Sequence, residues 1–238
     1  MASLPTTDKK AFVKDMFDNI APRYDVLNRI LSGGIDQQWR KKAIAMLKDD
    51  APSRILDVAT GTADLAILAG TLDPDEVVGV DIAEEMLQVG RTKIENRGLS
   101  NLIKLKHGDA EQLPFSEASF DAAVVAFGVR NFEDLALGLS EISRVLRPGG
   151  QLVVLEFSRP TRFPVKQLYA FYGRFILPTI GKMISGDDAA YKYLPESIEA
   201  FPDGADFLDV MRSSGFRGVS QKRLTFGIAS LYSGRSSG

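Results

Sequence analysis

The chain has 238 residues, of which 45% are hydrophobic and 25% charged, so it can bury the core of one α/β domain. With no cysteine and one histidine, it excludes disulfides, thiolate chemistry and histidine-rich metal sites. A formal net charge of -2 gives no overall attraction to nucleic acid, and no apolar run reaches the roughly 18–20 residues that span a bilayer. We expect one cytoplasmic domain over residues 1–238, with no nucleic-acid partner and no metal.

The first 50 residues are predicted to form an N-terminal helical cap. Phe12, Met16 and Ile20 recur at helical spacing, and later apolar residues continue the stripe. This spacing is typical of helices that pack on a sheet. A functional alternative is that Tyr24 and the Ser-Gly-Gly turn at 32–34 close over a ligand.

Residues 51–158 alternate strand-like and helix-like segments and are predicted to form a cofactor-binding core. The strand segments are almost continuously apolar, which indicates a parallel sheet covered by helices on both faces. Strands are expected at 54–59, 77–82, 102–106, 120–127 and 151–157, and helices at 64–72, 83–97 and 135–146.

Residues 159–202 are predicted to form a helical insertion or lid before the sheet is completed. Apolar residues crowd the segment 163–177, and Pro178 and Gly181 interrupt it. The closing part, 203–238, is predicted to hold a helix, two strands and a frayed tail. The helix is expected at 203–214, the strands at 218–224 and 226–232, and the tail at 233–238.

A turn after the first predicted strand organises the candidate site. Asp57 lies late in that strand, and Gly61 permits a tight turn that a ligand can approach closely. Thr62 and Asp64 offer side-chain oxygens where the next helix begins. At the carboxyl end of a parallel strand, such a turn is typical of nucleotide-type ligands.

Further carboxylates follow the next two strands. Asp81 comes about twenty residues after Gly61, where an acidic side chain can accept hydrogen bonds from ribose hydroxyls. Asp109 ends the third strand and can accept from an exocyclic amine of adenine. The turn lacks G-x-G-x-x-G, because Ala59 stands in place of its first glycine. The pattern favours a ligand with ribose, adenine and a cationic end over a pyrophosphate.

Each of these residues also has a structural interpretation. Asp57 can be a buried acceptor for amides of the turn, and Asp64 can charge a helix N-terminus. Asp81 can cap the second helix, and Asp109 can be a turn residue. The lone histidine, His107, is interpreted as structural rather than as a base.

The fourth predicted strand ends in Phe127-Gly128-Val129-Arg130-Asn131. A cation and an amide just past a strand end, opposite the turn, are well placed to touch a reacting group. Arg130 can stabilise a developing oxyanion. The alternative is that Arg130 pairs with a carboxylate across the lid.

These residues resemble the class I S-adenosylmethionine-dependent methyltransferases. The resemblance is closer to the menaquinone/ubiquinone-biosynthesis C-methyltransferases of the UbiE/MenG type, and it covers residues 12–232. It is carried by the strand-one turn, the acidic strand ends and the following segments: Tyr24-Asp25-Val26-Leu27-Asn28 with Ser32 and Trp39, Phe127–Asn131, Arg144–Gly150, Leu155–Ser158 and Tyr193–Ile198.

The resemblance implies a Rossmann-like α/β fold with a seven-stranded sheet whose last strand is antiparallel. It implies C-methylation of a polyprenylated quinol, demethylmenaquinol first, with a ubiquinone-pathway benzoquinol or a phylloquinone precursor as alternatives. The expected cofactor is S-adenosylmethionine. The residues expected to bind it are Asp57, Gly61, Thr62, Asp81, Ile82, Asp109, Ala110 and Phe127.

The residues expected to act on the acceptor are Arg130, Asn131 and Tyr24. The resemblance implies an electron-rich quinol ring, for which Arg130 would supply positive charge, Asn131 would orient a hydroxyl and Tyr24 would close over the site. Three positions depart from the family pattern. Ala63 stands where a second glycine is usual, Asp36 where a histidine is common, and Ala126 where a serine often precedes Phe-Gly.

Two other classes stay open, an NAD-dependent reductase and a non-catalytic S-adenosylmethionine-binding protein. The missing G-x-G-x-x-G argues against the first and the Arg130-Asn131 pair against the second. The segment 163–177 is predicted to hold a prenyl tail or to touch the inner membrane surface transiently, with a packed lid helix as the alternative. A homodimer is a further expectation.

Overall fold

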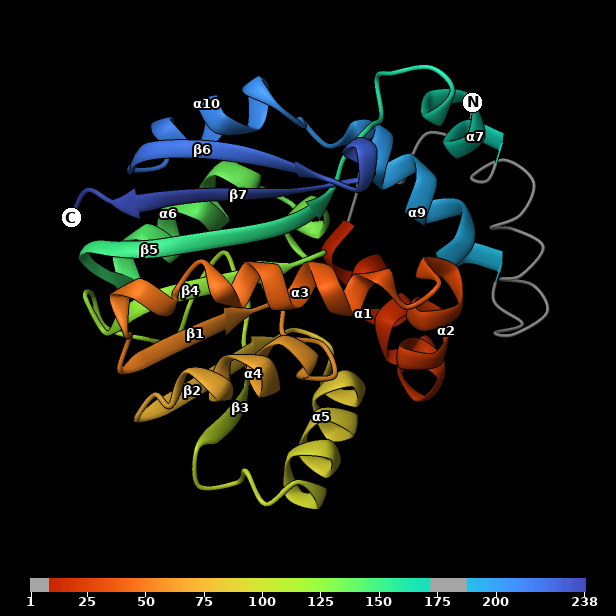
Figure 1. The fold of residues 1–238 in the computed structure, drawn as a ribbon. Coiled ribbons are helices and arrows are strands. Elements are labelled where there is room, and N and C mark those ends of the chain that lie inside the picture. The colour runs from red at the N-terminus through yellow and green to blue at the C-terminus, as the bar shows by residue number, and fades with distance from the viewer. Residues whose placement is uncertain (1–8, 172–187) are drawn as a thin grey trace.

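The computed structural model describes residues 9–171 and 188–238, which form one seven-stranded sheet with helices on both faces (Figure 1). The strand order is β3-β2-β1-β4-β5-β7-β6. Neighbouring strands from β1 to β5 are parallel, whereas β7 is antiparallel to both β5 and β6. The predicted seven-stranded sheet with an antiparallel last strand is therefore confirmed. The strands are β1 (Arg54–Val58), β2 (Glu76–Asp81), β3 (Ile103–His107), β4 (Phe120–Ala126), β5 (Leu146–Phe157), β6 (Phe216–Leu224) and β7 (Ala229–Ser236).

The helices fall into a cap, two layers on the sheet and an insertion. The cap is α1 (Lys9–Ile20), η1 (Ala21–Arg23) and α2 (Tyr24–Ser32), and the insertion contains α7 (Val165–Phe171) and α9 (Asp188–Ala200). Figure 1 shows α1, α2, α7 and α9 gathered beyond the carboxyl ends of the parallel strands. The other helices are α3 (Ile35–Ala45), η2 (Lys48–Asp50), α4 (Asp64–Ala69), η3 (Gly70–Leu72), α5 (Glu84–Asn96), η4 (Val129–Asn131), α6 (Leu135–Val145), α10 (Ala205–Ser213) and η6 (Thr225–Gly227).

Each face of the sheet has its own apolar core. On one face, helices α3, α4 and α5 contribute side chains such as Trp39 and Leu65. On the other face, α6 and α10 contribute side chains such as Leu139 and Phe207. Full burial of a side chain of this size stabilises the fold by about 1.5–3 kcal/mol. The two cores fix the position of the sheet and, with it, the position of the carboxyl ends of the parallel strands.

The C-terminal end of the chain corrects one expectation. Residues 233–238 were expected to fray, but β7 continues to Ser236 and pairs with β5 up to Arg235 opposite Gln151. The small residues fit a crowded position, because a Cβ atom at Gly234 would lie 3.0 Å from Val219 and 3.2 Å from Phe216. The Ser/Gly composition therefore reflects close packing between β5 and β6 rather than disorder.

Strand limits differ from the expected ones at two further places. β5 begins at Leu146, which pairs with Phe120 across an irregularity in the register, rather than at residue 151. The last strand begins at Ala229 instead of 226, because Thr225, Phe226 and Gly227 all have positive φ and form a tight turn. A turn of this kind cannot belong to a strand.

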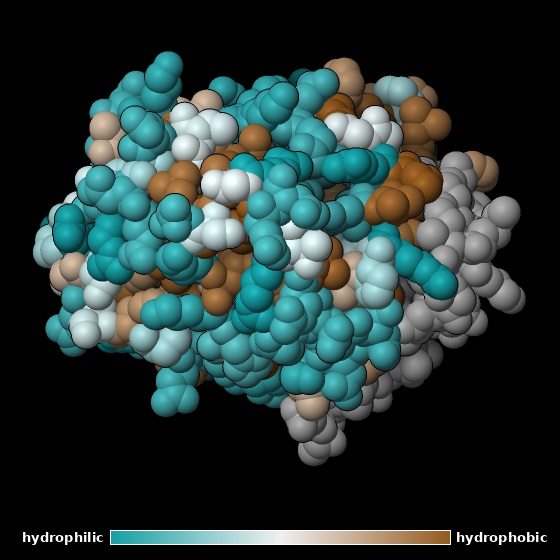
Figure 2. Space-filling view, turned by 90° about the horizontal axis from the view of Figure 1, so that it is seen from below, coloured by the Kyte–Doolittle hydropathy of each residue, from teal (hydrophilic) through white to brown (hydrophobic). Residues whose placement is uncertain are grey.

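The insertion is only partly covered by the structure. Pro178, Gly181 and the end of the segment 163–177 lie outside the described residues. In the described part, Phe163 is 81% and Leu168 is 65% exposed. Figure 2 shows apolar side chains at the surface on this end of the molecule. Within 9–171 and 188–238, no helix combines the length and the hydrophobicity that crossing a membrane requires.

Candidate active site

A pocket that opens to solvent lies between β1 and β4, where the order of the strands in the sheet reverses direction. Open α/β sheets bind their ligands at this kind of switch point. Its walls come from the turn after β1, the ends of β2, β3 and β4, and the cap helix α1. Most of the predicted site residues line it: Tyr24, Gly61, Asp81, Ile82, Asp109, Ala110, Phe127 and Asn131. Asp57, Thr62 and Arg130 lie outside its lining.

Asp81 holds the turn that follows β1. Its Oδ2 accepts from the backbone N–H of Gly61 at 2.7 Å, and its Oδ1 accepts from that of Ala83 at 2.9 Å. Burial raises the pKa of this carboxyl, and the bonds from the backbone amides oppose that shift. A carboxylate has about four acceptor sites, so Asp81 keeps free acceptor capacity. Asp81 therefore fixes the turn, binds the residue that precedes α5 rather than capping the helix, and can accept a further hydrogen bond from a ligand.

The turn itself adopts an unusual backbone. Ala59, Gly61 and Ala63 all have positive φ, at 54°, 56° and 65°. For the two alanines this conformation is strained, and such strain concentrates at binding sites. At Gly61, the nearest atom to an added Cβ would be Cε1 of Tyr24 at 4.0 Å. A ligand can therefore approach the backbone at Gly61.

Asp57 lies beneath the turn. Its Oδ2 accepts from Oγ1 of Thr60 at 2.6 Å, and within the described ranges its Oδ1 has no hydrogen-bond partner. Burial raises the pKa of Asp57 to about 7, while Thr60 and the charge of Arg40 act in the opposite direction. Asp57 is buried and supports the turn from below, as its structural interpretation expected, but the donor is the Thr60 hydroxyl rather than an amide of the turn.

Thr62 and Asp64 join the turn to the cap. Thr62 Oγ1 donates to Asp25 of α2 at 2.6 Å. Lys93 of α5 pairs with Asp25 at 2.8 Å and also with Asp64. Thr62 is buried in this cluster. The cluster fastens α2 onto α4 and α5 behind the pocket.

Asp109 meets a residue that sequence reasoning did not identify. Its Oδ1 accepts from the backbone N–H of Glu111 at 2.9 Å, and its Oδ2 lies 2.6 Å from Nζ of Lys10. Lys10 also pairs with Glu111 at 3.1 Å, and the hydrogen bond that it donates to Asp109 is the main cause of its raised pKa. Val13 and Phe17 of α1 complete this wall. No sequence signal joins α1 to a strand end about a hundred residues away.

Arg130 turns away from the pocket into a buried ion pair. Its Nη1 lies 3.0 Å from Oε1 of Glu156, which is fully buried, and its Nε donates to Oγ of Ser197 at 3.3 Å. Nη1 also donates to the carbonyl of Phe127. Arg130 does pair with a carboxylate, as the alternative expected, but the carboxylate is Glu156 of β5 and not a residue of the lid. Arg130 thus ties the loop after β4 to β5 and α9.

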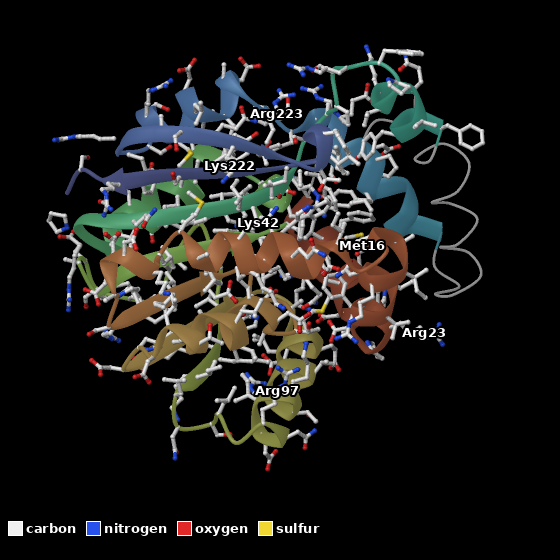
Figure 3. The ribbon with its side chains drawn as sticks, viewed as in Figure 1. Met16, Arg23, Lys42, Arg97, Lys222 and Arg223 are labelled. Atoms are coloured by element: carbon white, nitrogen blue, oxygen red, sulfur yellow. The ribbon has the colours of Figure 1, made fainter. Side chains whose placement is uncertain are left out.

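Asn131 faces the pocket and is held on two sides. Its Nδ2 donates to the carbonyl of Phe127 at 3.3 Å, and its Oδ1 accepts from the hydroxyl of Tyr193 at 3.1 Å. Tyr24 faces the same space from α2, with its ring edge-on to Phe17. Figure 3 shows Met16, which is buried with Val13 and Tyr193, on the α1 side near α9. Cap and insertion therefore meet at Asn131.

The charges of the pocket restrict its ligand. Among the described residues that line it are four carboxylates, Asp81, Asp109, Glu111 and Glu133, and one cation, Lys10. This lining repels a diphosphate and attracts a cationic group. Within the parts of the chain that the structure describes, no three His, Cys, Asp or Glu side chains come together as a metal site.

The model of the ubiE/COQ5 methyltransferase family matches residues 5–236. The chain belongs to that family. It is 52% identical over 225 residues to the demethylmenaquinone methyltransferase of Bacteroides fragilis, covering 94% of this chain and 92% of the relative. It is 48% identical over 220 residues to the Thermus thermophilus enzyme of the same name, covering 92% and 99%. With the ubiquinone/menaquinone biosynthesis C-methyltransferase of Geobacter sulfurreducens it shares 44% over 230 residues, covering 96% and 90%.

Solved structures show the same fold at lower identity. The magnesium protoporphyrin IX methyltransferase of Synechocystis, solved with bound S-adenosylhomocysteine, gives a TM-score of 0.66 at 18% identity and covers 96% of this chain and 100% of its own. A Thermotoga maritima S-adenosylmethionine-dependent methyltransferase gives 0.64 at 18%, covering 94% and 99%. The predicted family and fold class are therefore confirmed.

Two of the three positions that were expected to depart from the family pattern, Ala63 and Asp36, have local explanations. Ala63 takes a left-handed conformation with no exposed surface, and a Cβ at Gly90 of α5 would lie 3.2 Å from its methyl group. Asp36 is buried, accepts from Oγ of Ser32 at 2.7 Å and lies 3.6 Å from Nε of Arg40. In this chain, Asp36, at the position where a histidine was expected, therefore helps α2 to pack on α3.

Proposed function

We propose that this protein transfers a methyl group from S-adenosylmethionine to a ring carbon of a polyprenylated quinol, with demethylmenaquinol as the substrate. The observation that carries the proposal is the acidic pocket at the β1/β4 switch point, with Asp81 and Asp109 at neighbouring strand ends. The relatives named demethylmenaquinone methyltransferase support this choice of substrate.

The described residues fit the proposed cofactor. Gly61 leaves its backbone open, Asp81 keeps free acceptor capacity for a ribose hydroxyl, and Asp109 with Ala110 forms the next wall for an adenine. Glu111 and Glu133 add negative charge that suits a cationic ligand. When bound, the cofactor supplies an activated methyl group on a sulfonium.

The chain's task at the acceptor is to position the ring and exclude water. We assign contact with the ring to Asn131 and Tyr24, which face the pocket. Arg130 is assigned a positioning role, because its guanidinium is bound to Glu156 and to the carbonyl of Phe127. Asp57 and Thr62 are assigned the support of the cofactor turn, through Thr60 and Asp25.

The deciding experiment is transfer of labelled methyl to demethylmenaquinol and, in parallel, to the benzoquinol precursor of ubiquinone. We expect label in the naphthoquinol at a rate well above that in the benzoquinol. Thermal shift with S-adenosylmethionine and with NAD separates a methyltransferase from a reductase. Ligand-induced stabilisation without label in either quinol would instead favour a non-catalytic binding protein.

The prenyl tail gives the exposed insertion a use, and we propose that this end contacts an anionic membrane surface. Phe163 and Leu168 are exposed, and near them Arg162 and Lys166 form no ion pair with any described residue. Phe226, which is 81% exposed in the strained turn before β7, lies at the same end of the sheet as the insertion. Flotation with liposomes containing anionic lipid tests this contact, and F163S/F226S should abolish it. A homodimer stays a prediction, to be tested by analytical ultracentrifugation.

A further inference from the structure

The side-chain amide of Asn131 has one orientation that satisfies its neighbours. The carbonyl of Phe127 can only accept, so the amide nitrogen must face it, at 3.3 Å. The amide oxygen then faces the Tyr193 hydroxyl at 3.1 Å, and that hydroxyl must donate. Burial raises the pKa of Tyr193 to about 12, which keeps its proton in place at neutral pH.

This orientation leaves one hydrogen of the amide unused. A primary amide carries two N–H groups, and the one on the Phe127 side is occupied. Within residues 9–171 and 188–238, the second has no acceptor, and Asn131 lies in the pocket wall. Arg130 does not compete for this place, because its charge is held by Glu156. The pocket therefore receives a neutral N–H donor.

We propose that Asn131 donates this hydrogen to a ring oxygen of the quinol, and that Tyr193 is the positioning residue that holds the amide in the donating orientation. The inference rests on the proposed function and specifies how the acceptor is recognised. A donor at the ring oxygen stabilises the oxyanion that forms when the hydroxyl loses its proton. The negative charge then enriches the neighbouring carbon in electrons.

The chemistry balances with one proton released. The quinol hydroxyl loses its proton, and the ring carbon forms a C–C bond to the methyl group as the S–C bond breaks. The hydrogen on that carbon then leaves as a proton while the ring oxygen is protonated again. The thioether leaves uncharged, and the net products are the methylated quinol, S-adenosylhomocysteine and one proton.

The fold places Tyr193 where the cap and the insertion meet. Tyr193 is buried on α9, its ring lies 5.6 Å from that of Phe12 in α1, and Val13 and Met16 pack on it. One turn further along α9, Ser197 accepts from Arg130. The same helix therefore orients both members of the Arg130-Asn131 pair. The Asn131 amide is therefore held in its donating orientation only when α9 is docked.

The direct test is Tyr193→Phe, which removes the hydroxyl and keeps the ring packed on Phe12. We expect kcat for methyl transfer to fall about 10- to 100-fold, less than the loss of a whole oxyanion donor. The thermal shift caused by S-adenosylmethionine should stay unchanged. Tyr232→Phe is the matched control, because it also removes a buried hydroxyl, one bonded to Gly204 N–H, far from the pocket. It should keep wild-type kcat.

A second readout does not depend on turnover. The ultraviolet spectrum of 4-methoxy-1-naphthol, bound with S-adenosylhomocysteine, reports ionisation of its hydroxyl. We expect the pKa of the bound naphthol to rise by about one unit in Tyr193→Phe, which corresponds to the tenfold effect. Asn131→Ala, which removes the donor itself, should raise it at least as much, and the double variant should raise it no further than Asn131→Ala does. Asn131→Asp, which replaces the donor by an anion, should raise it more, and it supplies the test if Tyr193→Phe does not fold.

Opposite results would overturn the inference. Wild-type kcat and an unchanged naphthol pKa in Tyr193→Phe, or an unchanged pKa in Asn131→Asp, mean that the amide does not donate to the ring oxygen. Failure of the proposed function looks different, because the wild-type protein would then methylate no prenylated quinol. These outcomes separate an error about Tyr193 from an error about the reaction.

Discussion

The two sides of the pocket are held together in different ways. On the cofactor side, carboxylates bind backbone amides nearby in sequence, as Asp81 binds Gly61 and Ala83, 20 and 2 residues away. On the acceptor side, side chains bind other side chains across long separations. Asn131 and Tyr193 are 62 residues apart, and the cap residue Lys10 reaches Asp109, on the cofactor side, from 99 residues away. The first kind of bond is built into strand ends, whereas the second exists only when the cap and the insertion dock.

The largest expected effect is on the acceptor side, where Arg130→Ala leaves Glu156 as an unpaired buried carboxylate. Removing one partner of a buried ion pair costs about 3–5 kcal/mol. We expect a loss of this size in urea unfolding, with partial recovery in R130A/E156A. Arg212→Ala, which breaks the exposed pair with Asp209, should change stability by less than about 1 kcal/mol. Equal losses of stability in Arg130→Ala and Arg212→Ala would show that the buried pair with Glu156 contributes no more than the exposed pair.

On the cofactor side, Asp57 should make stability depend on pH. Its pKa is about 7 when folded against 3.8 as a free carboxyl, so the folded state binds more protons between these values. Stability from this group is therefore highest below about pH 4, falls as pH rises and levels off above 7. The stability of Asp57→Asn should therefore increase relative to wild type across that interval, by on the order of 4 kcal/mol in total. A constant difference from pH 4 to 8 would contradict the assignment.

Asp81→Asn tests the bonds between carboxylate and backbone. An amide offers one acceptor oxygen, so one of the Gly61 and Ala83 amides would face an N–H₂ group. A lost bond to a charged group is worth about 1.5–3 kcal/mol. We expect the Kd for S-adenosylmethionine to rise about 10- to 100-fold by calorimetry. Asp75→Asn, at an exposed position directly before β2, should leave it unchanged.

This contrast also explains what the sequence could predict. The cofactor side follows from strand-end carboxylates and a glycine turn, whose positions a parallel sheet brings together by itself. Asp81, Asp109 and Gly61 were therefore predicted as pocket residues and line it. The frayed tail was predicted wrongly because Ser and Gly have the same composition in a loop and in a crowded strand.

The acceptor side could be predicted only in part, from the end of the fourth strand and from the family resemblance. Helical spacing predicted the cap helices, but it could not show which face of α1 covers the pocket. Lys10 and Val13 were therefore not predicted as pocket residues. Arg130 and Asn131 are adjacent in sequence, yet one turns to Glu156 and the other to the pocket. That division depends on partners in β5 and α9, which no local pattern reveals.

Lys10→Ala tests how firmly the cap is held. The pair with Asp109 is about 30% exposed on both sides, so it should contribute about 0.5–1 kcal/mol at low salt and less at high salt. We expect this loss at 50 mM NaCl and a smaller one at 500 mM. Lys42→Ala, on α3 (Figure 3), removes an exposed lysine that forms no ion pair with a described residue. It should be neutral at both salt concentrations, and a salt-independent loss in Lys10→Ala would contradict an electrostatic latch.

The smallest effect is expected for Ala63→Gly in the cofactor turn. Glycine relieves the left-handed strain, worth about 1 kcal/mol, but the buried methyl group that meets α5 near Gly90 is lost, at about 0.8 kcal/mol. The two terms nearly cancel, so urea unfolding should move by less than about 0.5 kcal/mol. Ala118→Gly relieves the same strain at an exposed position with φ 51°, where no packing is lost. It should therefore stabilise the fold by about 0.5–1 kcal/mol. If both variants gain equally, the methyl group of Ala63 adds nothing to the packing, and the alanine here is only a strained substitute for the usual glycine.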